Sequence, residues 1–181
     1  MAELFDLIQN RRSVRKYEDK QIPENLLNQV LEAGRWAPSW HNFQCWEVVV
    51  VKDQAIKKKL QDAMPAKGNP ATKAIIQAPV VLGVCAKMES SGYYKGASTT
   101  KFGDWMMFDL GLFTQNICLT AHDLGLGTVI VGLYNHDQAK TAIDVPAGYE
   151  LVVLIPLGYP AKQPTAPPRK QIKEFVHENT F

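Results

Sequence analysis

The sequence predicts one domain of mixed helices and strands. Its 181 residues are about one domain's length and are enough to build a sizeable core. Two apolar runs, 79–86 and 151–157, are rich in β-branched residues and far shorter than the roughly 20 residues of a membrane helix, so they indicate buried strands. The segment 104–124 shows the longest helical pattern in the chain. Strand and helix patterns therefore alternate along a single domain, 1–181.

The first half of the chain predicts four helices and two strands. A first helix ends before Arg11, and a second spans 23–36, where Pro23 suits the first helical turn. The remaining elements, in order, are a strand over 46–52, a helix from its cap at Asp53 to Met64, a helix over 71–77 and the strand over 79–86.

The predicted helix 104–124 is apolar on more than one face. Such a helix suits a position between a sheet and a second chain, so we expect a dimer. The glycines of Gly125-Leu126-Gly127 follow this helix and precede a strand, the reverse of a dinucleotide-binding loop. They are better interpreted as a helix C-terminal cap.

After this cap we expect a strand over 128–131, a short helix over 137–143 and a strand over 150–157. From Tyr159 the composition changes, because four prolines prevent regular structure until a short segment near 172–177. Residues 159–181 are expected to form an extended C-terminal arm that covers its own sheet or a partner; a disordered tail is the alternative.

Charge and cysteine content exclude several classes of protein. The net charge of +2 is too small for a nucleic-acid-binding protein. The three cysteines are far apart in apolar surroundings, which indicates reduced thiols and a cytoplasmic location. The first twelve residues lack the apolar core of a signal peptide. No metal is expected, because paired cysteines and an HExxH motif are missing and Cys118 with His122 is typical of core packing.

Four cationic side chains surround one serine in Arg11-Arg12-Ser13-Val14-Arg15-Lys16. Guanidinium groups bind phosphate through charge-assisted hydrogen bonds, so this segment is a candidate site for a phosphorylated cofactor. In the alternative interpretation, Arg11 and Arg12 only cover the last carbonyls of the first helix. The residues alone leave both interpretations open.

Amide and hydroxyl side chains alternate with large rings from Trp36 to Trp46. Asn42 and Gln44 offer both donor and acceptor, which matches a heteroaromatic edge, while the rings could bury its faces. A turn built from ordinary core aromatics is the alternative. A phosphate site and an aromatic site in one small domain match the two ends of flavin mononucleotide (FMN).

The chain resembles the FMN-dependent nitroreductase family in the order and spacing of its motifs. These are Arg11-Arg12-Ser13-Val14-Arg15-Lys16-Tyr17, Ala37-Pro38-Ser39 with Asn42, Gln44 and Trp46, Gly125-Leu126-Gly127-Thr128 with Gly132, Leu157-Gly158-Tyr159-Pro160, and Pro168-Arg169-Lys170. The resemblance implies an α+β fold, a three-layer α/β/α sandwich with a mostly antiparallel central sheet. It also implies a homodimer with two FMN sites formed between the chains.

The resemblance assigns cofactor contacts to three parts of the chain. The phosphate, ribityl chain and pyrimidine edge of tightly bound FMN would be held by Arg11, Arg12, Ser13, Arg15 and Arg169. The partner chain would supply Pro38, Ser39, Trp40 and Asn42. The flavin ring would lie beside Ile130, Val131 and Gly132, whose backbone N–H groups face its reactive nitrogen, with Lys73 near the pyrimidine. Val131 and Pro167 depart from the glutamate and the basic residue found in some relatives.

The implied activity is an FMN-dependent oxidoreductase with NADH or NADPH as co-substrate. A hydride passes to FMN, and electrons then pass to a nitroaromatic, quinone or similar small acceptor by a ping-pong mechanism, with no obligatory side-chain acid or base. A lid over the ring is expected from Tyr93, Tyr94, Phe102, Trp105 and Met106, with dimer packing as the alternative. The alternatives for function are a non-catalytic FMN storage or sensor protein, or a relative acting as an ene-reductase or dehalogenase.

Overall fold

A four-stranded antiparallel sheet forms the centre of the computed structural model, which describes residues 3–181. The strands lie in the order β1 (Trp46–Val51), β2 (Val80–Lys87), β6 (Tyr149–Gly158) and β5 (Gly127–Thr128), and every neighbouring pair is antiparallel. All of β2 except Lys87 is buried, as its run of apolar residues predicts.

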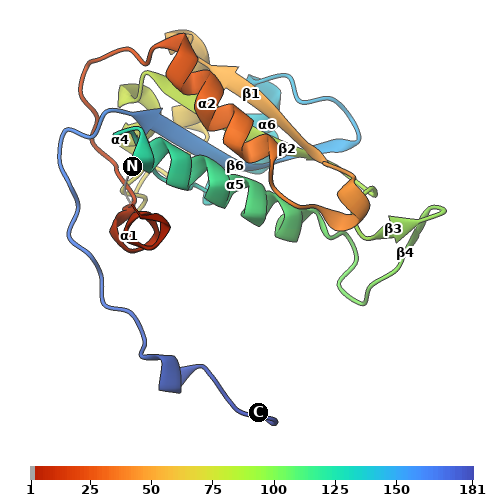
Figure 1. Ribbon diagram of the computed structural model, residues 1–181. Helices are drawn as coiled ribbons and strands as arrows, with labels where there is room; N and C mark the ends of the chain where they lie inside the picture. The colour runs from red at the N-terminus through yellow and green to blue at the C-terminus, as the bar shows by residue number, and fades with distance from the viewer. Residues whose placement is uncertain (1–2) are drawn as a thin grey trace.

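Helices cover both faces of this sheet (Figure 1). One layer consists of α2 (Glu24–Arg35) and α5 (Met106–Asp123), and the other of α3 (Gln54–Asp62), α4 (Thr72–Gln77) and α6 (His136–Ala142). Each layer buries its own apolar cluster against the sheet, one around Phe113 and Ile117 and the other around Leu60 and Ile75. The expected three-layer α/β/α sandwich with a mostly antiparallel sheet is confirmed.

Capping residues lie at two helix termini that the sequence predicts, the start of α3 and the end of α5. The Asp53 carboxylate accepts a hydrogen bond of 2.9 Å from the Ile56 N–H at the start of α3. At the end of α5, Gly125 has a φ of +74°, and its N–H donates to His122 O while the Leu126 N–H donates to Ala121 O. This pair of bonds is a Schellman cap, so the glycine motif is a helix end.

Two parts of the chain differ from the expected elements. The strand expected over 128–131 is shorter, because β5 pairs with β6 only at Gly127 and Thr128 and Val131 forms an isolated bridge to Leu154. Strands β3 (Tyr93–Tyr94) and β4 (Ala97–Ser98) form a hairpin that the sequence does not predict. Two-residue strands are too short to show an alternating pattern.

The N-terminal segment lies against the edge of the sheet. After α1 (Leu4–Asn10), the chain runs extended beside β5, and the Val14 N–H donates to Thr128 O at 2.8 Å. The Tyr17 hydroxyl lies 2.8 Å from Val14 O and 3.0 Å from Pro156 O, and burial raises its pKa so that it keeps its proton. These bonds hold residues 13–17 beside strand β6.

The C-terminal arm starts at this same edge and then leaves the body (Figure 1). Its Ala161 N–H donates to Lys16 O at 3.0 Å, after which nearly every residue is exposed. The short turn η2 (Ile172–Glu174) lies near its end, beside the exposed apolar residues Ile172, Phe175 and Val176. None of the helices within residues 3–181 has both the length and the apolar character needed to cross a bilayer.

Tyr17→Phe should lower the free energy of unfolding by about 1–2 kcal/mol, because it removes a buried hydrogen bond to a backbone carbonyl. Urea denaturation measures the change. Tyr94→Phe is the matched control, since Tyr94 is mostly exposed and should unfold like the wild type. Equal stability of the two variants would show that the Tyr17 hydroxyl does not fasten this segment.

Candidate functional site

A cavity of about 250 Å³ lies between the N-terminal segment and the arm. We call it the arginine cavity, and its lining residues are Arg11, Arg12, Ser13, Arg15, Pro164, Thr165, Pro167 and Arg169. The structure therefore brings Arg169 to the four N-terminal residues that the sequence singles out. Every lining side chain is cationic, hydroxylic or apolar, and none is acidic.

The arginine cavity is strongly electropositive. Within residues 3–181 none of its four arginines forms an ion pair with a carboxylate. The pKa of nearby His122 lies below its ordinary value, first because of partial burial and then because of Arg11 and Arg12. Like charges held together in this way favour an anion between them.

The two interpretations of the N-terminal arginines both have support. Arg12 Nη1 donates to Gln9 O at 2.6 Å and to Arg11 O at 2.9 Å, so it does cover carbonyls at the end of α1. Arg15 Nη1 donates to Ser13 O at 3.1 Å. Because a guanidinium has five N–H donors, each of these side chains retains donors for an anion.

Gly127 positions the cationic segment. A Cβ atom at Gly127 would lie 2.6 Å from Val14 Cγ2, so only glycine lets Val14 pack this closely against β5. Val14 is buried, whereas Ser13 and Arg15 on either side of it face the arginine cavity. The sequence motif marks Gly127 as part of a helix end and gives no sign of this second role.

A second cavity, of about 220 Å³, adjoins the first, because Arg15 lines both. Its other walls are residues 68–71 and residues 129–133, which include Ile130, Val131 and Gly132. The N–H of Val131 donates to Leu154 O at 2.9 Å and is not available to a ligand. Of the segment expected to offer N–H groups to the flavin, Ile130 and Gly132 have backbone N–H groups without a partner within residues 3–181.

Lys73 is exposed in the first turn of α4 and lines neither cavity. It lies two residues after Ala71, which does line the second cavity. Lys73 is therefore a near neighbour in sequence of the second cavity and is not one of its lining residues.

The Trp40 loop, residues 36–45, contains Pro38, Ser39, Trp40 and Asn42. A single 3-10 turn, η1 (Trp40–Asn42), joins them, and the Ser39 hydroxyl accepts from the Gln44 N–H at 2.9 Å. His41, Asn42 and Gln44 have φ values of 46°, 57° and 49°, in the left-handed region that non-glycine residues rarely adopt. Such backbone strain clusters at functional sites.

The Trp40 loop and the N-terminal segment that lines the arginine cavity lie at opposite ends of α5 (Figure 1). The loop is bonded to Asp109 in the first turn of this helix, whereas Val14 packs beside Gly127, just past its end. An 18-residue helix is about 27 Å long at about 1.5 Å per residue. One small ligand therefore cannot touch both parts within a single chain.

The residues expected to form a lid lie beside the Trp40 loop. The ring centroid of Trp105 is 5.7 Å from that of Trp40, 5.9 Å from that of Phe102 and 5.5 Å from that of Phe108. This aromatic cluster joins the loop to the start of α5. Met106, also expected in the lid, is half-buried at the first position of the helix.

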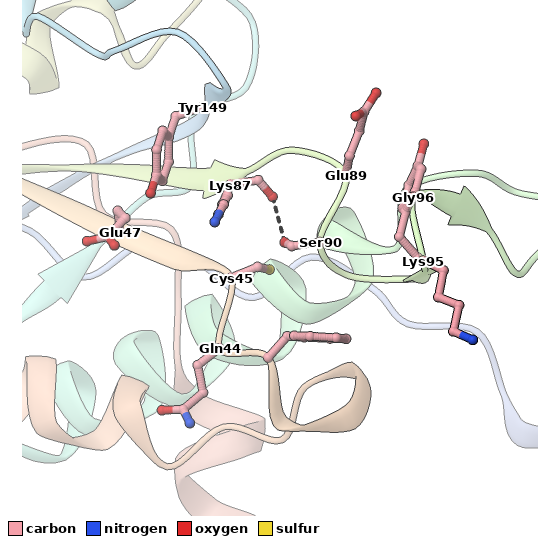
Figure 2. Close-up of a pocket in the computed structure, with 11 residues that line it drawn as sticks. Gln44, Cys45, Glu47, Lys87, Glu89, Ser90, Lys95, Gly96 and Tyr149 are labelled. Atoms are coloured by element: carbon pink, nitrogen blue, oxygen red, sulfur yellow. Dashed lines mark hydrogen bonds between the residues drawn. The ribbon is translucent and has the colours of Figure 1, made fainter.

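Tyr93 lines a cleft of about 550 Å³, which we call the hairpin cleft. Its other lining residues are Phe43, Gln44, Cys45, Glu47, Lys87, Glu89, Ser90, Lys95, Gly96 and Tyr149. Figure 2 shows Tyr149 and Glu47 at one end of it and Glu89 and Lys95 at the other. Tyr94 is mostly exposed and does not line the cleft. The two tyrosines therefore face different surroundings.

Asp109 is the residue of this region that the sequence analysis missed. Its carboxylate is buried in α5 and contacts both the Trp40 loop and Ser91. An acidic residue among the apolar residues of the first two turns of this helix was the available signal, because a carboxylate is almost never buried without partners.

A model of the nitroreductase family matches residues 8–159, which is most of the chain. The chain belongs to the nitroreductase family. A protein of Methanothermobacter thermautotrophicus, named as an NADH dehydrogenase/NAD(P)H nitroreductase, is 31% identical to this family member over 166 residues, covering 90% of this chain and 80% of its own.

An FMN reductase [NAD(P)H] of Bacillus subtilis is 29% identical to this nitroreductase-family chain, covering 100% of it and 75% of its own length. The crystal structure of a nitroreductase family protein from Clostridium novyi is 28% identical, with a TM-score of 0.78, and covers 88% of this chain and 87% of its own.

Gly127→Ala should destabilise this nitroreductase-family protein by about 1–3 kcal/mol, because the new methyl group overlaps Val14. Chemical denaturation of the protein without cofactor measures the change. Gly132→Ala is the control, since nothing lies within 4 Å of its Cβ position and its φ is not positive. If the Gly127 variant is as stable as the control, the close approach of Val14 does not depend on glycine.

Proposed function

We propose that this protein takes a hydride from NADH or NADPH and passes electrons to a nitroaromatic, quinone or similar small acceptor by a ping-pong mechanism. The chain is an NAD(P)H-dependent oxidoreductase of the nitroreductase family, with FMN as its cofactor. When bound, FMN supplies the redox chemistry, and the protein supplies binding and orientation. The observation that carries the proposal is the cluster of four arginines without a neighbouring carboxylate.

The donors of the two cavities fit the two ends of FMN. Arg11, Arg12, Arg15 and Arg169 with the Ser13 hydroxyl would hold the phosphate, because guanidinium groups form paired bonds to its oxygens. The flavin ring would lie in the second cavity beside Ile130–Gly132, with Arg15 between the ends. Lys73, exposed in the first turn of α4, would extend its flexible side chain to the pyrimidine edge.

The residues of this site would bind the flavin and tune its redox chemistry. The proposed reaction needs no side-chain acid or base. The positive charge of Arg15 beside the second cavity favours extra negative charge on the ring. The N–H groups of Ile130 and Gly132 are the donors left for a ring nitrogen. Donor and acceptor would use the same open face in turn, which is the physical basis of ping-pong kinetics.

We infer a homodimer in which each flavin site uses two chains. The Trp40 loop cannot reach the arginine cavity of its own chain, because α5 separates them. The α5 helix exposes Met107 and Phe108, and neighbouring α1 exposes Leu4, Phe5 and Ile8. A second copy on this face would cover those side chains and bring Pro38, Ser39, Trp40 and Asn42 to the partner's cofactor.

Gly111 supports this dimer. It lies mid-helix on the exposed face of α5, and nothing lies within 4 Å of its Cβ position. Glycine inside a helix costs about 1 kcal/mol relative to alanine, and nothing in the chain itself requires it here. If the backbone of the partner chain approaches closely here, the lack of a side chain at Gly111 is explained.

Residues 1–181 would form one FMN-binding domain, and its C-terminal arm, 159–181, would have two roles. Its first half closes the arginine cavity with Arg169, and its end offers Ile172, Phe175 and Val176 to the partner. The three free, buried cysteines support a reducing compartment, the cytoplasm.

Arg15→Ala should raise the FMN dissociation constant by about 10- to 150-fold, the equivalent of about 1.5–3 kcal/mol for a charge-assisted bond. Quenching of flavin fluorescence by the apoprotein measures the constant. Lys16→Ala removes the same charge from the next residue, which lines neither cavity, and should leave affinity nearly unchanged. Equal losses in both variants would mean that only net charge matters.

Anaerobic mixing of the FMN-loaded protein with NADH or NADPH tests the activity. The flavin should bleach with at least one donor and recolour when a nitroarene or a quinone is added. A protein that only stores or senses FMN would stay yellow, and that result would overturn the proposed enzyme function.

Gly111→Glu should convert the dimer to a monomer and release FMN, because a charged side chain would enter the surface that the partner covers. Size-exclusion chromatography with light scattering measures the mass. Gln77→Glu adds the same negative charge at an exposed position in α4 on the other layer and should leave the dimer intact. A Gly111→Glu protein that remains dimeric would place the interface elsewhere.

A further inference from the structure

One buried carboxylate lies within hydrogen-bond reach of three donors from two separate segments of the chain. Asp109 is only 1% exposed, and both its oxygens lie 3.1 Å from the backbone N of Trp40. Its Oδ2 also accepts from the Ser91 hydroxyl at 2.6 Å and faces the Cys45 thiol at 3.8 Å. The carboxylate belongs to the first turn of α5, where the helix dipole favours a negative charge.

These donors connect two elements that lie far apart in the sequence. Trp40 and Cys45 belong to the Trp40 loop, whereas Ser91 comes two residues before the β3–β4 hairpin. Ser91 is fully buried, and its carbonyl accepts from the Trp105 N–H at 2.9 Å. The loop and the hairpin are therefore fixed to the same turn of α5.

The Trp40 loop needs such an anchor. Three of its non-glycine residues, His41, Asn42 and Gln44, have positive φ values. A strained backbone of this kind persists only where its surroundings hold it. The bond from the Trp40 N–H to Asp109 ties the loop to α5, and bonds within the loop, such as that from the Gln44 N–H to the Ser39 hydroxyl, support its shape.

A carboxylate fits these donors better than an amide does. Two charged oxygens can accept from the Trp40 N–H, the Ser91 hydroxyl and the Cys45 thiol together, whereas an amide has one acceptor and would point its own N–H groups at donors. The thiol stays a donor, because burial, and next to it the charge of Asp109, raises the pKa of Cys45 to about 12.

We propose that Asp109 is a positioning residue that couples the flavin-contacting Trp40 loop to the β3–β4 hairpin, so that FMN bound in the partner's site orders the hairpin and sets the width of the hairpin cleft. The cleft lies between these two tethered segments, with Cys45 on one wall and Ser90 on the other (Figure 2). The inference rests on the proposed function, because it takes the Trp40 loop as part of a flavin site.

Amide hydrogen exchange followed by mass spectrometry tests the coupling in the full-length dimer, with and without FMN. Ser91→Ala cuts only the link to the hairpin, Asp109→Asn weakens both links, and Thr114→Val is an isosteric control at a buried position of the same helix. The FMN dissociation constant, from flavin fluorescence, is the second readout.

In the wild type, FMN should slow exchange in both 39–45 and 91–99. In Ser91→Ala, residues 91–99 should exchange faster and no longer respond to FMN, while FMN affinity stays within about twofold of wild type. In Asp109→Asn both segments should exchange faster, and the dissociation constant should rise by about tenfold or more. Thr114→Val should behave as wild type.

An FMN response of residues 91–99 that survives in Ser91→Ala would overturn the coupling, and so would an Asp109→Asn protein with wild-type affinity and exchange. Faster exchange throughout Asp109→Asn, rather than in the two segments, would show that Asp109 serves folding alone and would also overturn the proposal. A wild type that binds no FMN would instead refute the proposed function, while exchange without FMN would still report whether Asp109 tethers both segments.

Discussion

The length of helix α5 is the constraint on which the rest of the account depends. Its first turn fixes the Trp40 loop through Asp109, and the cap at its end places Gly127 against Val14 and so fixes the cationic segment. A rigid helix of 18 residues, about 27 Å long, keeps these two parts from sharing a ligand within one chain. A flavin site that uses both must therefore be assembled from two chains.

Hydrogen bonds outside the arginine side chains fix the N-terminal wall of the arginine cavity. Val14, Tyr17 and Lys16 are tied to β5, β6 and the start of the arm, so charges of one sign are held together without a compensating carboxylate. A site arranged before its ligand arrives loses little entropy on binding. Mutual repulsion among the arginines is the cost of that order, and a phosphate offsets it.

Periodicity and capping chemistry predicted most of the fold. The buried strands around Val81 and Leu154, the cap at Asp53 and the helix end at Gly125 follow from local physics, so a single sequence reveals them. The β3–β4 hairpin was missed because its strands are two residues long. At Val131, the bridge to Leu154 uses an N–H group that local sequence could not show to be engaged.

The candidate site was only partly predictable, because its geometry is tertiary. The N-terminal arginines could be recognised from their spacing, but Arg169 entered through resemblance to the nitroreductase family. Asp109 was overlooked, since its donors Trp40, Cys45 and Ser91 are all distant from it in the sequence. Gly127 was recognised as part of a cap, and its contact with Val14 appears only when the segments are packed.

The most direct test of the two-chain site is a heterodimer purified from two defective variants, one with Arg15→Ala and Arg169→Ala, the other with Trp40→Ala and Asn42→Asp. If each site takes its arginines from one chain and its Trp40 loop from the other, the heterodimer regains one intact site. Flavin absorbance should then give one FMN per dimer, while both homodimers bind none. A heterodimer as empty as its parent homodimers would contradict the account.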